Sequence, residues 1–287
     1  MIRKARLKAF AKLNLGLRVL YKRPDGFHEL RTIFQTISLA DRIAISFERA
    51  STTLIEIEGT PEIEDNLIGR AAALVLDSLR IRGRVHFRLD KVIPMGAGLG
   101  GGSSDAAAVL IGLPVLAGRP LEAERARSIA LQLGSDVPFF LYGGTALGLG
   151  RGEELYPLPD LPKSPALIIA PPIHSSTAEA YHDLSARLTT ESLQNKLLSF
   201  QQEVWRGGRA DTVNDFEKVV FARYPQLSRV RNQLLRSGAR RAAMTGSGSA
   251  VFGIFEDAVS LERARSRFSR ERVFSVSFLN RAQYRSA

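Results

Sequence analysis

The stretch PMGAGLGGGSSDAAAVL, residues 94–110, places five glycines between Gly96 and Gly102, directly before an apolar run. Glycine in such density has an entropic cost, so the chain must need bare backbone at this point. Successive free amides at the N-terminus of a helix form a concavity that binds anions, and the helix dipole strengthens it. Ser103 and Ser104 would cap that helix, and their hydroxyls would meet a phosphate or its magnesium ion. The stretch therefore predicts a phosphate-binding loop, with a tight turn needed only for packing as the alternative.

Two common nucleotide-binding patterns do not account for this loop. The segment GAGLGG fits G-x-G-x-x-G, but it follows several predicted strands and its helix leads to another helix. A dinucleotide fold puts that pattern in its first strand–turn–helix unit. A Walker A loop ends in Gly-Lys-Ser/Thr, whereas this loop ends in Gly-Gly-Ser-Ser. The sequence therefore favours neither a nicotinamide site nor an ordinary P-loop.

The composition is that of an ordinary soluble globular protein of one or two domains. Hydrophobic residues make up 45% and charged residues 24% of the 287. The N-terminus lacks the apolar core of a secretory signal, no apolar stretch reaches membrane-spanning length, and there is no cysteine. The net charge of +11 comes from dispersed basic residues, without an RNA-binding signature or zinc-finger spacing. We therefore expect a cytoplasmic protein that binds neither nucleic acid nor a membrane, and whose positive field suits a small anionic substrate.

The hydrophobic pattern predicts an α+β fold, because strands and helices do not alternate regularly. In the first half we expect strands over residues 7–21, 31–39, 41–49, 51–60 and 83–93. The helices expected there cover residues 65–80, 121–134 and a segment from about Ser104 to a stop or kink near Pro114. In the second half we expect strands over 166–170 and 272–279, and helices over 177–188, 193–202, 226–237 and 261–268. The proline- and glycine-rich segment 150–173 predicts a crossover near residue 160, which divides the chain into residues 1–160 and 161–287.

Several segments, in family order, resemble the GHMP kinases. The glycine-rich stretch is similar to their phosphate loop, and the resemblance narrows to one branch, the cytidylyl-methylerythritol kinases. The segments that carry it are AKLNLGLRVLYKRPDGFHELRTIFQTISLAD (11–41), GAGLGGGSSDAAAVL (96–110), LGSDVPFFLYGGTALGLGRGEEL (133–155), NDFE (214–217) and TGSGSAVFGIF (245–255). The resemblance implies the GHMP kinase fold, in which the N-terminal half is like domain 2 of ribosomal protein S5. The C-terminal half would be ferredoxin-like, and the active site would lie between the two.

The resemblance also implies an activity and a set of residues. The chain would be an ATP-dependent kinase that phosphorylates the 2-hydroxyl of 4-(cytidine 5'-diphospho)-2-C-methyl-D-erythritol, in non-mevalonate isoprenoid precursor synthesis, with ATP and Mg²⁺ as cofactors. Asp136 would be the catalytic base and Lys12 its electrostatic partner. The implied ATP-binding residues are Gly96, Ala97, Gly98, Leu99, Gly100, Gly101, Gly102, Ser103 and Ser104. The implied substrate-binding residues are Asn14, Phe27, His28, Thr177, Tyr181, Gly246, Ser247 and Gly248.

The proposed catalytic and base-reading residues also have structural interpretations. Asp136 would simply start a short helix through Phe140, and Lys12, beside Asn14 on the polar face of a strand, would be solvated. The alternation from Leu7 to Tyr21 supports that polar face.

His28 would either hydrogen-bond a cytosine edge or remain a solvated loop histidine. Phe27 stands where the branch usually has tyrosine, so a ring face remains without its hydroxyl. Tyr181 would be the second stacking face or would pack its helix. His86, His174 and His182 lack metal-binding spacing, so we assign them no chemistry and assign no metal ligand.

Two other functions remain open at this point. One is a GHMP kinase of the homoserine or mevalonate type, against which the segment RPDGFHEL counts. The other is a catalytically silent binding protein on the same scaffold, against which the presence of Lys12 and Asp136 counts. The silent protein would resemble a basic RNA-associated module. For the leading kinase hypothesis we expect a small-molecule substrate as the partner, and a chain that is a monomer or a homodimer.

Overall fold

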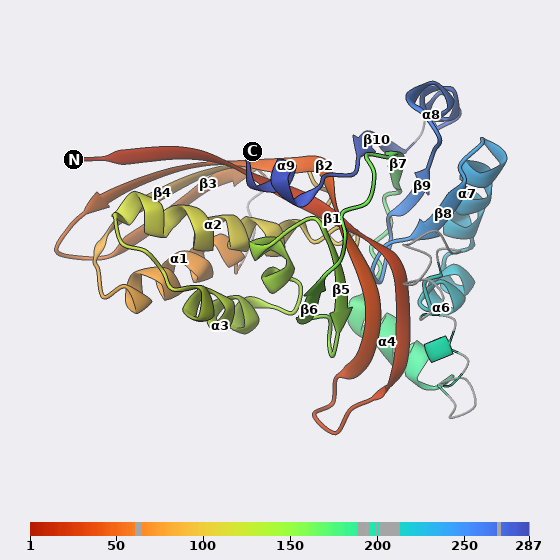
Figure 1. The fold of residues 1–287 in the computed structure, drawn as a ribbon, viewed down its shortest axis with the longest axis horizontal. Helices are drawn as coiled ribbons and strands as arrows, with labels where there is room; N and C mark the ends of the chain where they lie inside the picture. Colours follow the sequence, from red (N-terminus) through yellow and green to blue (C-terminus); the bar gives the residue numbers. More distant parts are fainter. Residues whose placement is uncertain are drawn as a thin grey trace.

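Two long antiparallel strands, β1 (Arg3–Lys22) and β2 (His28–Arg49), dominate the first sheet of the computed structural model (Figure 1). The structure describes residues 1–60, 65–188, 194, 196–198, 200, 213–268 and 271–286. Strand β2 runs through both segments that we expected as separate strands, because Ala40 stays paired with Phe10 of β1. The prediction of two strands over 31–39 and 41–49 is therefore wrong.

Strand β1 does not keep one apolar and one polar face along its whole length. Irregularities in its pairing with β2 fall between Phe10 and Lys12, between Asn14 and Gly16, and between Val19 and Tyr21. Each irregularity interrupts the two-residue alternation of side chains. Residues 9–20 are all buried, so the interpretation of Lys12 as a solvated strand residue is wrong.

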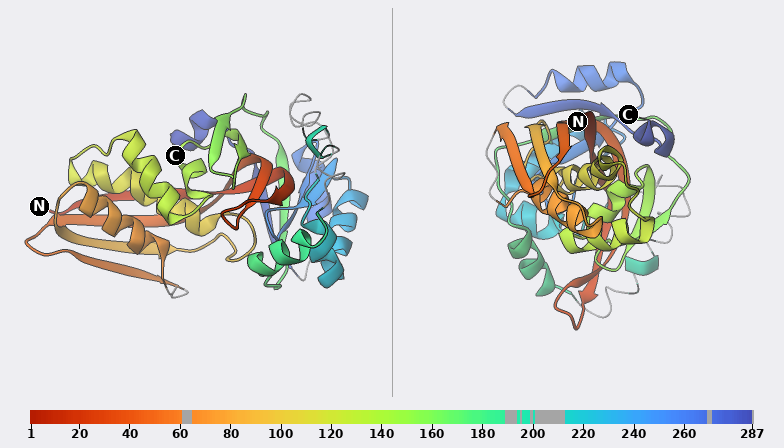
Figure 2. Two further views of the ribbon diagram at one scale, coloured as in Figure 1. Left: turned by 90° about the horizontal axis from the view of Figure 1, so that it is seen from below. Right: turned by 90° about the vertical axis from the view of Figure 1, so that its left-hand side faces the viewer.

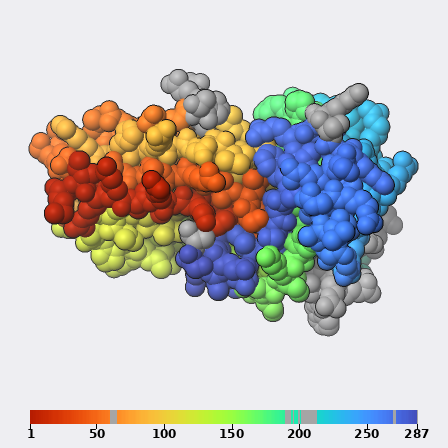
Figure 3. Space-filling view, turned by 90° about the horizontal axis from the view of Figure 1, so that it is seen from above, coloured from red at the N-terminus to blue at the C-terminus, as the bar shows by residue number. Residues whose placement is uncertain are grey.

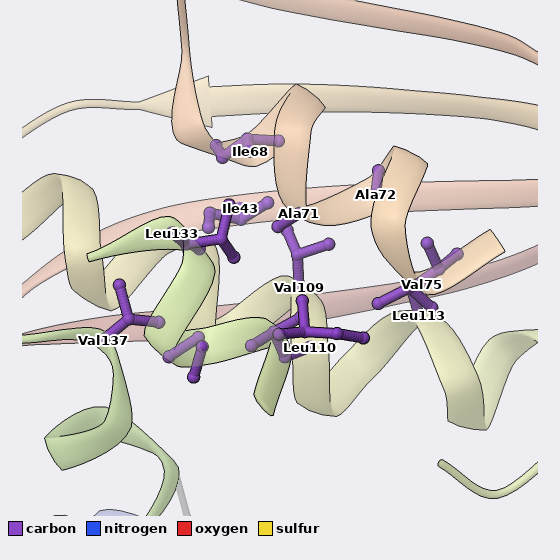
Figure 4. Close-up of a cluster of buried hydrophobic side chains, with 14 of the residues drawn as sticks. Ile43, Ile68, Ala71, Ala72, Val75, Val109, Leu110, Leu113, Leu133 and Val137 are labelled. Atoms are coloured by element: carbon purple, nitrogen blue, oxygen red, sulfur yellow. The ribbon is translucent and has the colours of Figure 1, made fainter. Parts of the chain in front are cut away.

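The remaining strands of the first sheet extend it on both sides of β2. The strand order is β3–β4–β2–β5–β6, with β1 paired to β2 outside this path. These strands are β3 (Leu54–Thr60), β4 (Gly83–Asp90), β5 (Thr145–Leu149) and β6 (Glu154–Pro157). Helices α1 (Leu67–Ser78), α2 (Gly101–Ala117) and α3 (Ala123–Leu133) lie on one side of this sheet (Figure 1). Figure 4 shows how Ile43 of the sheet, Val75 of α1, Leu110 of α2 and Leu133 of α3 meet in one core.

The central helix α2 differs from its prediction at both ends. It begins at Gly101 rather than near Ser104, and it continues through Pro114 to Ala117. Pro114 lacks the amide hydrogen that would bond to the carbonyl of Leu110, so the helix loses that one hydrogen bond, and it ends three residues later. Gly118 ends the helix with a φ of 68°, and its amide bonds back to the carbonyl oxygens of Pro114 and Val115.

A second, antiparallel sheet with the order β10–β7–β9–β8 organises the rest of the chain. Its strands are β7 (Pro165–Ala170), β8 (Arg241–Met244), β9 (Val251–Ile254) and β10 (Arg272–Ser277). Among the described residues of this half are the helices α4 (Thr177–Ser185), α6 (Glu217–Arg223), α7 (Pro225–Arg236) and α8 (Ala258–Arg265). The helix expected over 193–202 falls largely outside the described residues. The mixture of two sheets with separate helices confirms the predicted α+β class.

A shared hydrophobic core joins the two halves. It includes Leu13 and Ile37 from the first sheet and Ile168 and Phe252 from the second, all fully buried. The chain also returns to the first half after β10, where the amide of Leu279 donates to the carbonyl of Thr36. Helix α9 (Arg281–Arg285) follows this return, and its Tyr284 packs against Phe10 of β1 and donates to the carbonyl of Phe140. The halves lie side by side along the long axis of the molecule in Figures 2 and 3, and the core holds them together.

Candidate active site

A cavity of about 910 Å³ opens where the glycine loop (residues 96–102), the β1–β2 hairpin and α4 meet. Its volume lies in the range of small-molecule sites. Both residues expected to be catalytic and all of those expected to bind substrate line it. The lining residues that the sequence singled out are Lys12, Asn14, Phe27, His28, Gly96, Gly98, Gly100, Ser103, Asp136, Thr177, Tyr181, Gly246, Ser247 and Gly248.

In the glycine loop, residues that line the cavity alternate with residues that anchor the loop in the core. Gly96, Gly98 and Gly100 line the cavity, and all three have a positive φ. Between them, Ala97 and Leu99 are buried in the core shared by the halves. Three bare backbone segments therefore face the cavity while the two side chains fix the loop from behind.

Gly98 is required by close packing against the second half. A Cβ atom built on it would lie 2.2 Å from the carbonyl oxygen of Thr245, and its φ is +78°. No larger residue fits this position without moving the backbone of one loop. The shape of the glycine loop is therefore set partly by the turn after β8.

The N-terminus of α2 does not present every implied ATP-binding residue to the cavity. Ser103 lines the cavity, whereas Ser104 is buried and its hydroxyl has no hydrogen-bond partner among the described residues. Gly101 and Gly102 do not line the cavity either. A Cβ on Gly101 would lie 3.0 Å from the Lys91 ammonium, so the bare backbone of this glycine lets the Lys91 side chain approach α2 closely.

A buried cluster of three charged side chains fixes the start of α2. The ammonium group of Lys91 donates to Asp41 Oδ2 at 2.5 Å and to Asp105 Oδ2 at 2.6 Å. The other oxygen of Asp41 accepts from the amides of Val92 and Ile93. Burial raises the pKa of Asp105 to about 7, with Lys91 opposing that shift and Asp41 adding to it. The cluster ties α2 to β2 and to the segment that leads into the glycine loop.

Lys12 and Asp136 form an ion pair at the cavity, with 3.4 Å between Lys12 Nζ and Asp136 Oδ2. The Lys12 side chain is 4% exposed and the Asp136 side chain is 35% exposed. Asp136 precedes the 3₁₀ helix η1 (Val137–Leu141), but its side chain makes no capping hydrogen bond. The structural interpretation of Asp136 as a helix cap is therefore wrong for its side chain, and its carboxylate is available to the cavity.

Asn14 connects Lys12 to both halves of the molecule. Its Oδ1 accepts from Lys12 Nζ at 2.6 Å, and its Nδ2 donates to Thr32 Oγ1 at 2.8 Å. Its backbone amide donates to Thr245 Oγ1 at 3.1 Å, across 231 residues of sequence. The Thr32 hydroxyl in turn donates to the carbonyl of Gly16. This network fixes the position of the lysine ammonium.

The β1–β2 hairpin presents an exposed aromatic ring to the cavity. The Phe27 side chain lies at the hairpin tip, and the residue is 51% exposed. The guanidinium group of Arg151 lies 4.5 Å from the centre of its ring. A cation at this distance from a ring is attracted to its face. Arg151 therefore supports one face of this exposed ring.

His28, expected to hydrogen-bond the cytosine edge, and Tyr181, expected to be the second stacking face of the base, contact each other directly. Their rings stack with centroids 4.9 Å apart and an interplanar angle of 24°. Nε2 of His28 lies 2.6 Å from Ser185 Oγ, and the Ser185 hydroxyl donates to the Tyr181 carbonyl. Burial and the charge of Lys22 lower the pKa of His28. Burial, together with the nearby Asp136 charge, raises the pKa of Tyr181.

The loop after β8 contacts the start of α4 through hydroxyl groups. Ser175 Oγ donates to the carbonyl of Ser247, and the hydroxyls of Thr177 and Ser247 lie 2.8 Å apart. The two small-residue segments therefore form one wall of the cavity.

Sequence reasoning missed several residues of the site. Thr32, Arg151, Ser185 and His174 all line the cavity, and the imidazole of His174 lies against Gly96. No local signal marks Thr32 or Ser185, since each acts through a partner far away in the sequence. Arg151 stands in the segment GRGEEL that carried the family resemblance, and this was the available signal.

In the described part of the chain, no three His, Cys, Asp or Glu side chains gather in a group that would hold a metal ion. Within the same residues, no helix has the length and apolar composition needed to cross a bilayer.

Comparison with known proteins defines the class of this fold and site. The model of the GHMP kinases N terminal domain matches residues 66–144, and the model of the GHMP kinases C terminal domain matches residues 194–273. The first match covers the glycine loop and Asp136, and GHMP kinases are ATP-dependent phosphotransferases.

Relatives and solved structures narrow the class. A 4-diphosphocytidyl-2-C-methyl-D-erythritol kinase from Solibacter usitatus is 55% identical, over 99% of this chain and 92% of its own length. The enzyme of the same name from Geobacter sulfurreducens is 40% identical, over 93% of this chain and 98% of its own. A crystal structure of 4-(cytidine 5'-diphospho)-2C-methyl-D-erythritol kinase, 36% identical, superposes with a TM-score of 0.81 over 96% of this chain and 99% of that one. The chain belongs to the 4-diphosphocytidyl-2-C-methyl-D-erythritol kinase family of the GHMP kinases, which confirms the family and fold expected from the sequence.

A homoserine kinase from Cytophaga hutchinsonii shares the fold at 17% identity, with a TM-score of 0.74 over 97% of this chain and 95% of that one. This likeness concerns the fold alone.

Proposed function

We propose that this chain transfers the γ-phosphoryl group of ATP to the 2-hydroxyl of 4-(cytidine 5'-diphospho)-2-C-methyl-D-erythritol, with Asp136 as base and Lys12 as its electrostatic partner. The observation that carries the proposal is the 3.4 Å ion pair between Lys12 and Asp136 beside the glycine loop. The name and near-full-length match of the relatives support the choice of substrate.

Phosphoryl transfer needs positioning, neutralisation of charge and a base for the attacking hydroxyl. The substrate oxygen forms a bond to the γ-phosphorus, its proton passes to Asp136, and the bond from the γ-phosphorus to the bridging oxygen of ADP breaks. Lys12 stabilises negative charge on the incoming oxygen and the phosphoryl group. Because Asn14 fixes the ammonium, this stabilisation requires little rearrangement.

The cavity suits a substrate with several phosphates. Among the described residues that line it, Lys12, Lys22 and Arg151 carry positive charge and Asp136 carries negative charge. The bare amides of the glycine loop add partial positive charge at the N-terminus of α2. We assign the triphosphate of ATP to this loop.

Mg²⁺ would neutralise the β- and γ-phosphates that it accompanies into the site. The hydroxyl of Ser103, which lines the cavity at the start of α2, is an oxygen ligand that fits a hard cation or a phosphate.

We assign the cytidine to the hairpin and α4. The base stacks on the exposed ring of Phe27, which Arg151 supports, and its edge is read by His28, on which Tyr181 stacks. Thr177 and Gly246, Ser247 and Gly248 would line the path of the substrate diphosphate.

The test is coupled ADP release with the cytidylyl substrate, with homoserine and mevalonate offered in parallel. We expect turnover on the cytidylyl substrate and a loss of at least 10²-fold in Asp136→Asn. Equal rates for the wild type and Asp136→Asn would refute the assignment of the base. Preference for homoserine or mevalonate would refute the substrate.

A further inference from the structure

The hydroxyl of Ser185, the last residue of α4, links the backbone of that helix to the imidazole of His28. Ser185 Oγ lies 2.6 Å from the carbonyl oxygen of Tyr181, one helical turn earlier, and 2.6 Å from Nε2 of His28. The two contacts join residues 157 positions apart in the sequence.

Only one assignment of hydrogen atoms satisfies both contacts of Ser185 Oγ. A serine hydroxyl carries a single hydrogen, and a carbonyl oxygen only accepts, so that hydrogen goes to Tyr181. Ser185 Oγ must then accept from His28, which requires a hydrogen on Nε2. Because burial and Lys22 lower the pKa of His28, the imidazole is neutral at neutral pH. A neutral imidazole protonated at Nε2 has its lone pair at Nδ1.

We propose that Ser185 is a positioning residue that makes Nδ1 of His28 a hydrogen-bond acceptor, and that it thereby sets the preference of the site for cytosine over uracil. Cytosine carries an exocyclic amino group, which donates, at the position where uracil carries a carbonyl oxygen, which accepts. An acceptor at Nδ1 forms a hydrogen bond with the amino group of cytosine. With uracil, two acceptors face each other, and no hydrogen bond forms. The inference rests on the proposed function, in which His28 reads the base.

The surroundings of His28 hold the ring in this arrangement. Tyr181 covers one face of the imidazole, and Phe216 meets Tyr181 edge-on with centroids 4.7 Å apart. The ring therefore has little freedom to turn over and exchange its two nitrogens. Without the serine hydroxyl, the carbonyl of Tyr181 would no longer dictate the tautomer, and either nitrogen would carry the hydrogen.

The test compares the wild type with Ser185→Ala and Ser185→Thr in kinetics with the cytidine and uridine forms of the substrate. We expect Ser185→Ala to lower the ratio of kcat/KM values for cytidine and uridine by at least about tenfold, mainly through KM. Ser185→Thr keeps a hydroxyl and should retain the ratio. Ser266→Ala is the matched control, because Ser266 also donates to a carbonyl within its own helix end, that of Arg263.

A second measurement reads the tautomer directly. Long-range ¹H–¹⁵N NMR of the histidine rings, with His28→Gln used to assign the signals, should show a hydrogen on Nε2 in the wild type and a mixture of tautomers in Ser185→Ala. A wild type with its hydrogen on Nδ1, or an unchanged cytidine preference in Ser185→Ala, would overturn the inference. Failure of the proposed function gives a different result, namely no turnover of the cytidylyl substrate by the wild type, and the NMR measurement still decides the tautomer.

Discussion

Replacing Lys12 by methionine should separate catalysis from stability. Methionine keeps the length and most of the apolar stem of lysine, which packs beside Phe34 and Gly100, and removes the charge together with the hydrogen bond to Asn14 Oδ1. The ammonium stabilises charge that develops during transfer. Removing one such fixed group typically lowers kcat by about 10²–10³-fold, or about 2.7–4 kcal/mol. We expect a loss of that size in kcat/KM.

The stability of Lys12→Met should change by no more than about 1 kcal/mol. Removing one partner of a fully buried ion pair costs about 3–5 kcal/mol, because it leaves the other charge without water. Here the remaining partner, Asp136, is 35% exposed, so water solvates its carboxylate. The mutation also relieves the cost of burying the ammonium, since Lys12 is only 4% exposed. Asn14 Oδ1 loses the Lys12 donor but keeps the hydroxyl of Thr245 at 3.4 Å. We therefore expect the cost of the lost contacts and the relief of burying a charge nearly to cancel.

The assay is coupled ADP release, with urea denaturation for the free energy of unfolding. Lys8→Met is the control, since Lys8 is an exposed lysine on the same strand, and both quantities should stay at the wild-type value. A kcat/KM within tenfold of the wild type would refute the electrostatic role. A loss of more than about 3 kcal/mol in stability would refute the argument that Asp136 is solvated.

Three further variants test the loop, the buried cluster and the stacking ring. Gly98→Ala meets the carbonyl of Thr245 and a φ of +78°, so we expect it to lose more stability in urea than Gly26→Ala, which has a positive φ but open space around it. The pKa of Asp105 is about 7 in the folded state and near 4 in the unfolded state. Between pH 4 and pH 7 the carboxyl group therefore holds a proton in the folded state and has lost it in the unfolded state. Unfolding free energy should therefore fall as pH rises from 4 to 7, and Asp105→Asn should flatten that slope in urea titrations. Phe27→Ala should raise the KM for the cytidylyl substrate by about 5–150-fold, the value of one base stack, while Phe27→Tyr keeps it; equal KM values would exclude stacking.

The centre of the site was predictable because its signals are local in the sequence. The glycine density predicts the loop. The two-residue spacing of Lys12 and Asn14 predicts a shared face, and their 2.6 Å hydrogen bond confirms it, because no irregularity of β1 falls between them. The ion pair with Asp136 was within reach of the sequence only through the family resemblance, since 124 residues separate the two positions in the chain.

The parts that sequence reasoning missed depend on tertiary contacts. The irregularities of β1 follow from its fit against β2, and no local pattern encodes them. Pro114 predicted the end of a helix, but the strong packing of α2 against the sheet outweighs one missing hydrogen bond. Ser185 has no motif of its own, because its role arises only when the fold brings it to His28.

The site belongs to neither half alone. The carbonyl of Thr245 in the second half lies against Gly98, and the hydroxyl of the same residue accepts from the amide of Asn14, which holds the ammonium of Lys12. One residue after β8 thus supports both the loop assigned to the phosphates and the lysine assigned to the reaction. The buried core between the sheets keeps that residue in place, since large apolar interfaces resist relative motion of the parts they join. Both parts of the chemistry therefore depend on the contact between the halves, which the hydrophobic residues of that junction maintain.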